Sequence, residues 1–254
     1  MTQRYEARET LRIDRHQMEH LLGELEHGFN RPKVSRRQFR RFRFRQRHCE
    51  VLLWHVDDPS TMPSFRSGSG GRVEIWPRAE VRPRIFLMET RNLSVMGISL
   101  LHGAFIHPGV CARVALTARN GETRHIEGRV VACRYLRQGV HEVGVRFESP
   151  IRIRDYCPEA DDLTDEFVGE IRAQVDSLKQ ALDDEGWRES VRILCDAVRT
   201  RAVGYGMDDV GEAAQGIAQA APKVESIEPL KARVDELLAI CGRHLGGASG
   251  QTSG

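Results

Sequence analysis

One stretch of the chain concentrates residues that can bind an anion. Residues 31–47 read RPKVSRRQFRRFRFRQR and hold nine Lys or Arg and no acid. The whole chain has 38 basic and 36 acidic residues, so this stretch is a local exception in a nearly neutral protein. Guanidinium groups bind phosphate oxygens and the edge of guanine through paired hydrogen bonds, and their flat faces stack on bases. The stretch therefore indicates an anionic partner: a nucleic acid, a membrane or a small phosphate ligand.

A second group of polar residues lies at residues 92–97, which read NLSVMG, where one predicted strand turns into the next. Asn92 and Ser94 are two positions apart, so on an extended strand their side chains share a face. Gly97 has no side chain and lets a neighbouring group approach the backbone closely. This spacing predicts that an amide, a hydroxyl and an open backbone position face one ligand.

In this order, the two groups resemble the motifs of PilZ domains. Residues 37–41, RQFRR, fit the RxxxR motif of that family, and Arg36 stands where an additional arginine often occurs. Residues 92–97 fit its [D/N]xSxxG motif. The segments GRVVACRY and VGVRF are similar to its closing strands, so the resemblance covers roughly residues 31–152.

PilZ domains are receptors for the bacterial second messenger cyclic di-GMP, and the resemblance implies that ligand here. It implies that arginines hold the phosphates and guanines, while the second motif bonds the other side of the ligand. The implied ligand-binding residues are Arg36, Arg37, Arg41, Asn92, Ser94 and Gly97. The family's behaviour also implies that the arginine segment closes over the ligand and reorients the preceding helix. The arginines from Arg43 to Arg47 are expected to lead into the first strand and to face solvent.

The preceding helix is predicted over residues 9–27, where apolar residues recur at helical spacing. The residues that form this apolar stripe are Leu11, Met18, Leu21, Leu22 and Leu25. We expect the helix to pack on its own domain. The alternative is that it forms a homodimer.

The next part of the chain is predicted to be a small antiparallel barrel, because short strands follow one another without a helical pattern between them. Asn120-Gly121 is a strong hairpin signal within this part. In the last strand, Val143, Val145 and Phe147 are expected on one face. Strands are predicted at residues 49–56, 72–77, 84–102 with a break at Gly97, 112–136 around the hairpin, and 141–150. Residues 58–71 are predicted to be a flexible loop, and a parallel sheet is not expected.

After Pro150 the composition changes, since residues 155–189 hold twelve acids and three basic residues. Four sets of apolar residues at helical spacing predict a four-helix bundle. The expected fold class is therefore α+β and multidomain, with a six-stranded antiparallel β-barrel followed by the bundle. The expected division is an N-terminal helix (1–30), a PilZ-like barrel (31–152), a linker (153–160), the bundle (161–245) and a disordered tail (246–254).

The bundle distantly resembles a histidine phosphotransfer domain, because residues 195–202, CDAVRTRA, and then Gly206 follow that family's helix motif. The position of the phospho-accepting histidine holds Asp196, and no histidine occurs from residue 142 to 243. Phosphorelay is therefore not expected. An unrelated bundle that docks a protein partner is the alternative, and Asp196 is expected to lie on a solvated face.

Signals for other kinds of function are weak. The six cysteines form no CxxC pair and are expected to be buried, reduced thiols. The histidines form no metal motif, no phosphate loop is present, and neither catalysis, a metal nor a cofactor is expected. The N-terminus has no apolar core and no run is long enough to span a membrane, so a cytoplasmic protein is expected.

The resemblance thus implies a cytoplasmic bacterial receptor or adaptor for cyclic di-GMP, with the bundle expected to act as an output or docking module for a protein partner. Two alternatives stay open. One is a nucleic-acid-binding arm in which Phe39, Phe42 and Phe44 stack on bases. The other is a PilZ-like interaction protein that binds no ligand.

Overall fold

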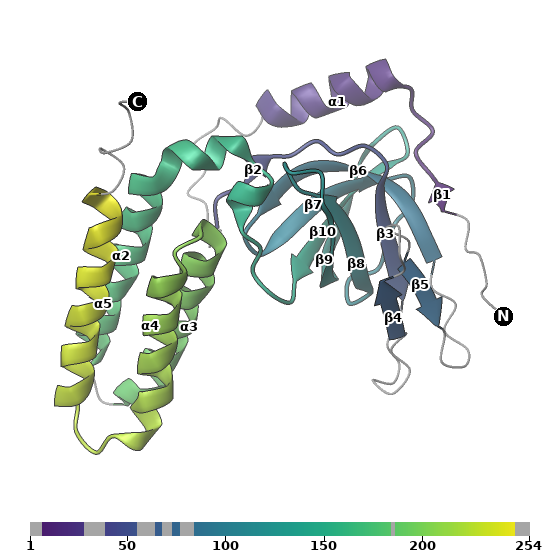
Figure 1. Cartoon of the computed structure of the whole chain (residues 1–254). Coiled ribbons are helices and arrows are strands. Elements are labelled where there is room, and N and C mark those ends of the chain that lie inside the picture. The colour runs from purple at the N-terminus through teal and green to yellow at the C-terminus, as the bar shows by residue number, and fades with distance from the viewer. Residues whose placement is uncertain are drawn as a thin grey trace. The chain divides into compact units, whose positions relative to one another are not determined.

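The structure, a computed structural model, describes residues 7–27, 39–54, 84–183 and 186–246, and the backbone of residues 64–67 and 73–76. Contacts divide the chain into two compact units, Met1–Ser149 and Pro150–Gly254 (Figure 1). Each unit is described by itself. The predicted arginines Arg36 and Arg37 lie outside the described residues.

The first unit contains a closed six-stranded antiparallel barrel, as predicted. Its strands follow the order β6-β3-β8-β9-β10-β7, and pairing of β6 with β7 closes the ring. Every neighbouring pair in this ring is antiparallel. The bounds are β3 (Cys49–Trp54), β6 (Arg84–Ser94), β7 (Gly97–His102), β8 (Cys111–Thr117), β9 (Thr123–Arg137) and β10 (Val140–Phe147).

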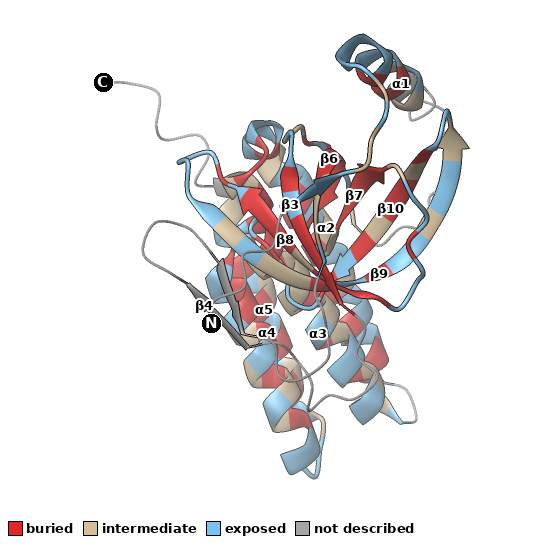
Figure 2. Ribbon diagram, turned by 90° about the vertical axis from the view of Figure 1, so that its right-hand side faces the viewer, coloured by how far each residue is buried: buried red, intermediate tan, exposed pale blue. Residues whose placement is uncertain are grey.

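Apolar residues of the barrel strands form its core, and Figure 2 shows buried residues along these strands. Val143, Val145 and Phe147 alternate along the single strand β10 and are all buried, so they share one face, the inner one, as predicted. The residues between them, such as Gly144 and Arg146, therefore lie on the outer face. The Asn120-Gly121 turn joins β8 to β9, also as predicted.

Two short strands lie outside the barrel, which corrects the prediction for this region. β4 (Ser64–Ser67) falls within the predicted loop, and β5 (Val73–Trp76) is the predicted strand at residues 72–77. They pair with each other as a separate two-stranded sheet. The closed ring offers β5 no free edge, so its backbone hydrogen bonds are met by β4 instead.

The N-terminal helix begins later than predicted. Residues Arg8–Glu9 form a short strand, β1, parallel to β6, and the helix α1 spans Arg15–His27. Asp14 and Gln17 form a reciprocal cap. The backbone N–H of Gln17 donates to Asp14 Oδ1 at 2.8 Å, and the backbone N–H of Asp14 donates to Gln17 Oε1 at 3.0 Å. This cap sets the start of α1 at Arg15.

α1 packs on the barrel through the apolar stripe that the sequence predicts. Met18, Leu21 and Leu22 form a buried cluster with Leu101 of β7 and Val140 of β10. Leu11, Ile13, Leu25 and Leu136 pack around the same cluster. Because Leu101 and Val140 belong to the outer face, α1 covers one end of the outer face of β7 and β10.

The second unit is the predicted four-helix bundle. Neighbouring helices pack in the ring α2–α3, α3–α4, α4–α5 and α5–α2. Their bounds are α2 (Thr164–Ala181), α3 (Trp187–Tyr205), α4 (Asp208–Ala220) and α5 (Glu228–Gly246). Two short 3₁₀ helices, η3 (Ile153–Asp155) and η4 (Pro158–Leu163), precede α2, and η5 (Ala221–Lys223) contains the predicted break at Pro222.

Features that would suggest other functions are weak in the described part of the chain. All six cysteines are free, and five of them are buried. Burial raises the pKa of Cys49 and of Cys195 to about 12, so both thiols stay protonated at neutral pH. Within the described residues, no group of three or more His, Cys, Asp or Glu could hold a metal ion. No described helix has the length and apolar character needed to cross a bilayer.

Replacing Gly103 by alanine should loosen the segment before α1. A Cβ at Gly103 would overlap the backbone carbonyl of Thr10, whose hydroxyl accepts from the Gly103 amide at 3.0 Å. We expect Gly103→Ala to lower the free energy of unfolding by about 1–3 kcal/mol in urea titrations. The control is Gly23→Ala in α1, where a Cβ meets nothing within 4 Å. That variant should gain about 0.5–1 kcal/mol, and an equal gain for both would contradict the contact.

Candidate functional site

The outer face of the barrel carries a row of aligned residues across five strands, which we call the outer row. Its members are Arg43, Asn92, Ser99, Gly144 and Ala132, and each is the Cα partner of the next across the sheet. Directly paired residues point to the same side of an antiparallel sheet. Arg43 lies on β2 (Phe42–Arg43), which pairs with β6 beyond the end of β3. Three small residues thus lie beside an amide and a guanidinium group.

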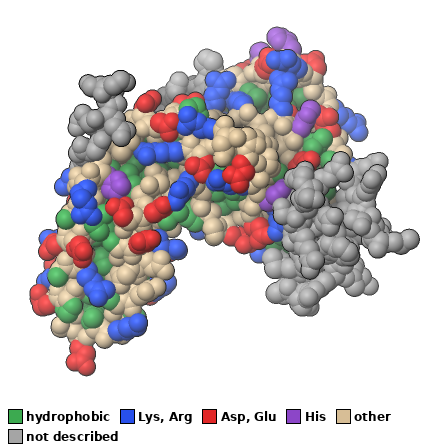
Figure 3. All heavy atoms as spheres, viewed as in Figure 1, with side chains coloured by type: hydrophobic (Ala, Val, Ile, Leu, Met, Phe, Trp, Pro, Cys, Tyr) green, Lys and Arg blue, Asp and Glu red, His purple; other side chains and the backbone are tan. Residues whose placement is uncertain are grey.

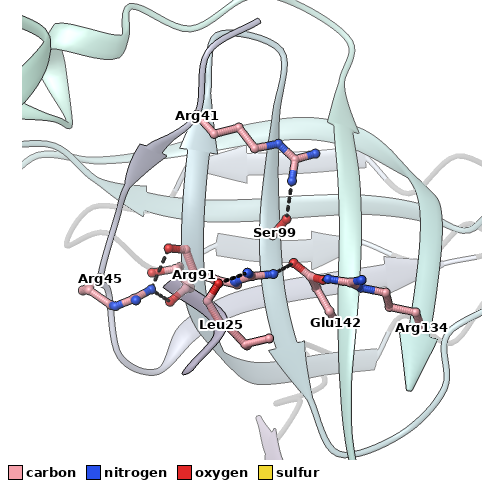
Figure 4. A network of polar contacts seen from close by, with 8 residues as sticks. Leu25, Arg41, Arg45, Arg91, Ser99, Arg134 and Glu142 are labelled. Atoms are coloured by element: carbon pink, nitrogen blue, oxygen red, sulfur yellow. Dashed lines mark hydrogen bonds and ion pairs between the residues drawn. The ribbon is translucent and has the colours of Figure 1, made fainter. Parts of the chain in front are cut away.

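The predicted residue Arg41 reaches the outer row. Its Nη1 donates to Ser99 Oγ at 3.3 Å, and the close-up shows the guanidinium above that serine (Figure 4). Asn92 and Ser99 are buried, while Gly144 is half-buried and Ala132 is exposed. The outer row is therefore covered at β6 and β7 and open at β10 and β9. Val131, next to Ala132, is 54% exposed.

The second predicted motif is divided between two tasks. Asn92 is buried, and its Nδ2 is a donor without a hydrogen-bond partner among the residues that the structure describes. Ser94 instead donates its hydroxyl to the carbonyl of Gly97 at 3.1 Å, within the turn. A Cβ at Gly97 would lie 2.5 Å from the carbonyl oxygen of Val145, so glycine allows β7 and β10 to approach. The structure thus brings Arg41 and Asn92 to the outer row, while Ser94 and Gly97 shape the turn beside it.

A buried ion pair borders the outer row on the side of α1. Nη1 of Arg91 pairs with Oε1 of Glu142, and these side chains are only 6% and 8% exposed. Arg134 donates to Oε2 of the same glutamate at 2.6 Å through Nε, and its exposed guanidinium lies beside it in Figure 4. Burial opposes ionisation of Glu142, but the charges of Arg91 and Arg134 outweigh it and lower the pKa of Glu142.

Arg45 does not face solvent, contrary to the prediction for residues 43–47. It is half-buried, and its Nη1 donates to the carbonyl of Arg91 at 2.6 Å and to that of Thr90 at 3.4 Å. Burial, and then the nearby charge of Arg91, lowers the pKa of Arg45. These carbonyls lie at an irregularity of the β6–β7 ladder between Thr90 and Asn92, where ordinary ladder bonds are interrupted. Arg45 is therefore a structural residue, whereas Arg43 and Arg47 are exposed as predicted.

Two of the three phenylalanines in the basic stretch are not available for stacking on nucleic-acid bases, while Phe39 is half-buried. Phe42 and Phe44 are buried, at 5% and 8% exposure, so both rings belong to the core. On the face drawn in Figure 3, Lys and Arg side chains are interspersed with Asp and Glu over the described part of each unit. Neither observation matches a basic groove with exposed aromatic platforms.

The helical unit gives a structural reason for two residues singled out in the sequence. Gly206 ends α3 with a positive φ of 78°, and the Met207 amide donates to the carbonyl of Ala202 at 2.7 Å. This is a Schellman-type cap, which favours glycine. The carboxylate of Asp196 is 64% exposed and bonds Arg199 on the same helix, which fits a solvated face. The resemblance to a histidine phosphotransfer domain stays a prediction.

Comparisons with known proteins identify no family for this chain. No family model matches it, and no curated protein is similar to it. Among solved structures it is similar to a PilZ domain with c-di-GMP of YcgR from Escherichia coli. The two share 11% identity over 45% of this chain and 79% of that one, with a TM-score of 0.25. A match at this level supports no conclusion, so the barrel is defined by its own strand pairing.

Replacing Glu142 by glutamine should destabilise the first unit in a pH-dependent way. Because the folded state lowers the pKa of Glu142, the ion pair stabilises the fold above the ordinary pKa of 4.5 and this contribution is lost as the pH falls through the lowered value. We expect Glu142→Gln to lose about 3 kcal/mol at pH 7 in urea titrations, since it leaves a buried Arg91 charge poorly compensated. The difference from the native chain should shrink at acidic pH.

The matched control is Glu127→Gln, which removes the partner of Arg113 in another cross-strand ion pair, between β8 and β9. That pair is more exposed, so the control should lose about 1 kcal/mol or less. Equal losses for the two variants, or a loss for Glu142→Gln that does not change with pH, would show that burial of the ion pair is not what stabilises this face.

Proposed function

We propose that the chain is a receptor for cyclic di-GMP that binds on the outer row of the barrel. The observation that carries this proposal is the alignment of Arg43 and Asn92 with small residues, with Arg41 bonded to the same row. A planar base can lie on Gly144 and Ala132, where no long side chain rises from the sheet. The guanidinium groups at one end can meet phosphate oxygens or a guanine edge.

The resemblance of both sequence motifs to those of PilZ domains supports this ligand over other nucleotides. Arg36 and Arg37 belong to the proposed site by that resemblance alone. Arg41 and Asn92 have additional support, because both lie at the covered end of the outer row and Asn92 has a buried donor without a partner. In this proposal Ser94 and Gly97 hold the turn.

The proposal includes binding without catalysis, in the cytoplasm of a bacterium. The bundle is proposed to present a surface to a protein partner. A homodimer stays a prediction, as does any relation of the bundle to phosphotransfer domains. The ligand-free interaction protein is the second candidate, and the unpartnered donor of Asn92 favours the receptor over it, because a buried donor is costly unless something occupies it.

Isothermal titration calorimetry of the full chain with cyclic di-GMP tests the ligand and its residues. We expect saturable binding at micromolar concentrations. Arg41→Ala and Asn92→Ala should each weaken it by about tenfold or more, because each removes a hydrogen bond to a charged or buried group. Arg37→Ala should have a similar or larger effect. The control is Arg119→Ala, an exposed arginine in the turn between β8 and β9, which should bind like the native chain.

Two outcomes of this titration would contradict the proposal in different ways. Absence of heat up to tens of micromolar ligand would reject cyclic di-GMP. Normal binding by both Arg41→Ala and Asn92→Ala would leave the ligand correct and the assignment of its site wrong.

A gel-shift experiment with a labelled oligonucleotide at two salt concentrations tests the nucleic-acid alternative. A phosphate-binding arm would bind the oligonucleotide strongly at low salt, and its affinity would fall steeply at higher salt. Added cyclic di-GMP would not compete with the oligonucleotide. We expect no stable shift at either concentration, because Phe42 and Phe44 are buried. A salt-sensitive shift that the dinucleotide does not compete away would favour the arm.

A further inference from the structure

Arg91 links the last turn of α1 to the barrel. Its Nη2 donates to the backbone carbonyl of Leu25 at 3.1 Å, while Nη1 holds Glu142 (Figure 4). The last four carbonyls of a helix have no partner within the helix, and α1 ends at His27. A cation at this end also interacts favourably with the helix dipole. The barrel thus supplies the C-terminal cap of α1.

The same arginine adjoins the proposed ligand site. Arg91 directly precedes Asn92 and occupies the irregular position in the β6–β7 ladder. Its carbonyl accepts from Arg45 at 2.6 Å, in the segment that also carries Arg41 and Arg43. Because Arg91 is held on its side chain by α1 and on its backbone by Arg45, its placement fixes where Asn92 presents its unpartnered donor.

Among the described residues, the other polar contacts between α1 and the rest of its unit are exposed. Glu19 bonds Arg47 at 3.4 Å with both side chains 55% exposed, and Glu24 pairs with Arg137. Exposed ion pairs of this kind contribute little, so they do not orient the helix strongly. The apolar cluster around Leu21 supplies the docking energy, and the part-buried contact of Arg91 with Leu25 is a polar link to the ligand face.

We infer that docked α1 is a positioning element of the ligand site, acting through Arg91 and Glu142 on Asn92. This inference rests on the proposed function, because it concerns the same site. It differs from a ligand-driven release of the helix: here the docked state is the one that binds. The coupling must then be reciprocal, so the ligand holds α1 more firmly on the barrel.

The test weakens α1 docking without touching the ligand face. Leu21→Ala removes a side chain that is 2% exposed in the apolar cluster, and Met18→Ala is a milder version. We expect Leu21→Ala to weaken cyclic di-GMP binding about tenfold in calorimetry, within the range of measured couplings. Gly23→Ala, which alters α1 where a Cβ has open space, should not weaken it. Circular dichroism confirms that each variant keeps its fold.

Hydrogen exchange followed by mass spectrometry distinguishes positioning of the ligand site by α1 from a role of α1 in overall stability. Cyclic di-GMP should slow exchange within α1 of the native chain. Without ligand, Leu21→Ala should speed exchange at residues 90–94 of β6, and Gly23→Ala should leave it unchanged.

The outcomes separate the inference from the proposed function. If the native chain binds cyclic di-GMP and Leu21→Ala binds it with the same affinity, the inference is wrong and the receptor function stands. The same holds if the ligand speeds hydrogen exchange within α1 of the native chain. No binding by the native chain rejects the function. In that case, hydrogen exchange of residues 90–94 without ligand still tests whether α1 positions Asn92. An exchange rate in Leu21→Ala equal to that of the native chain would reject this positioning role.

Discussion

The ion pair between Arg91 and Glu142 is the contact around which the outer face of the barrel is arranged. Both charges are withdrawn from water, which is costly unless each is matched by a partner and by further hydrogen bonds. Arg134 and the carbonyl of Leu25 supply those bonds. The pair joins β6 to β10 across β7. Through its further hydrogen bonds it also contacts Arg134 of β9 and the last turn of α1.

The closed barrel explains how residues distant in sequence become one surface. Strand pairing aligns Arg43, Asn92, Ser99, Gly144 and Ala132 on the outer face, and small side chains keep most of that row low. Close approach of β7 and β10 at Gly97 leaves no room for a Cβ there. Glycine at this position therefore serves the sheet first and any ligand only through it.

Patterns that are local in sequence predicted much of the structure. Alternation in β10, the Asn120-Gly121 hairpin and the apolar stripes of α1 and of the bundle all follow from short-range periodicity. The start of α1 could also have been predicted, because Asp14 and Gln17 have the spacing of a capping box. Ser99 and Glu142 were missed because their roles depend on strand register. Arg45 was misjudged because a basic run does not reveal which arginine turns to backbone carbonyls. No sequence signal showed that β5 would pair with β4.

We propose that a small anionic ligand occupies the outer row, and ¹H–¹⁵N spectra of the full chain, recorded during addition of cyclic di-GMP, test this proposal. We expect the backbone amides of Ser99 and Gly144 and the side-chain amide of Asn92 to shift together and saturate, while amides in the β8–β9 turn stay in place. Shifts confined to residues outside the outer row, or no shifts at saturating ligand, would contradict it.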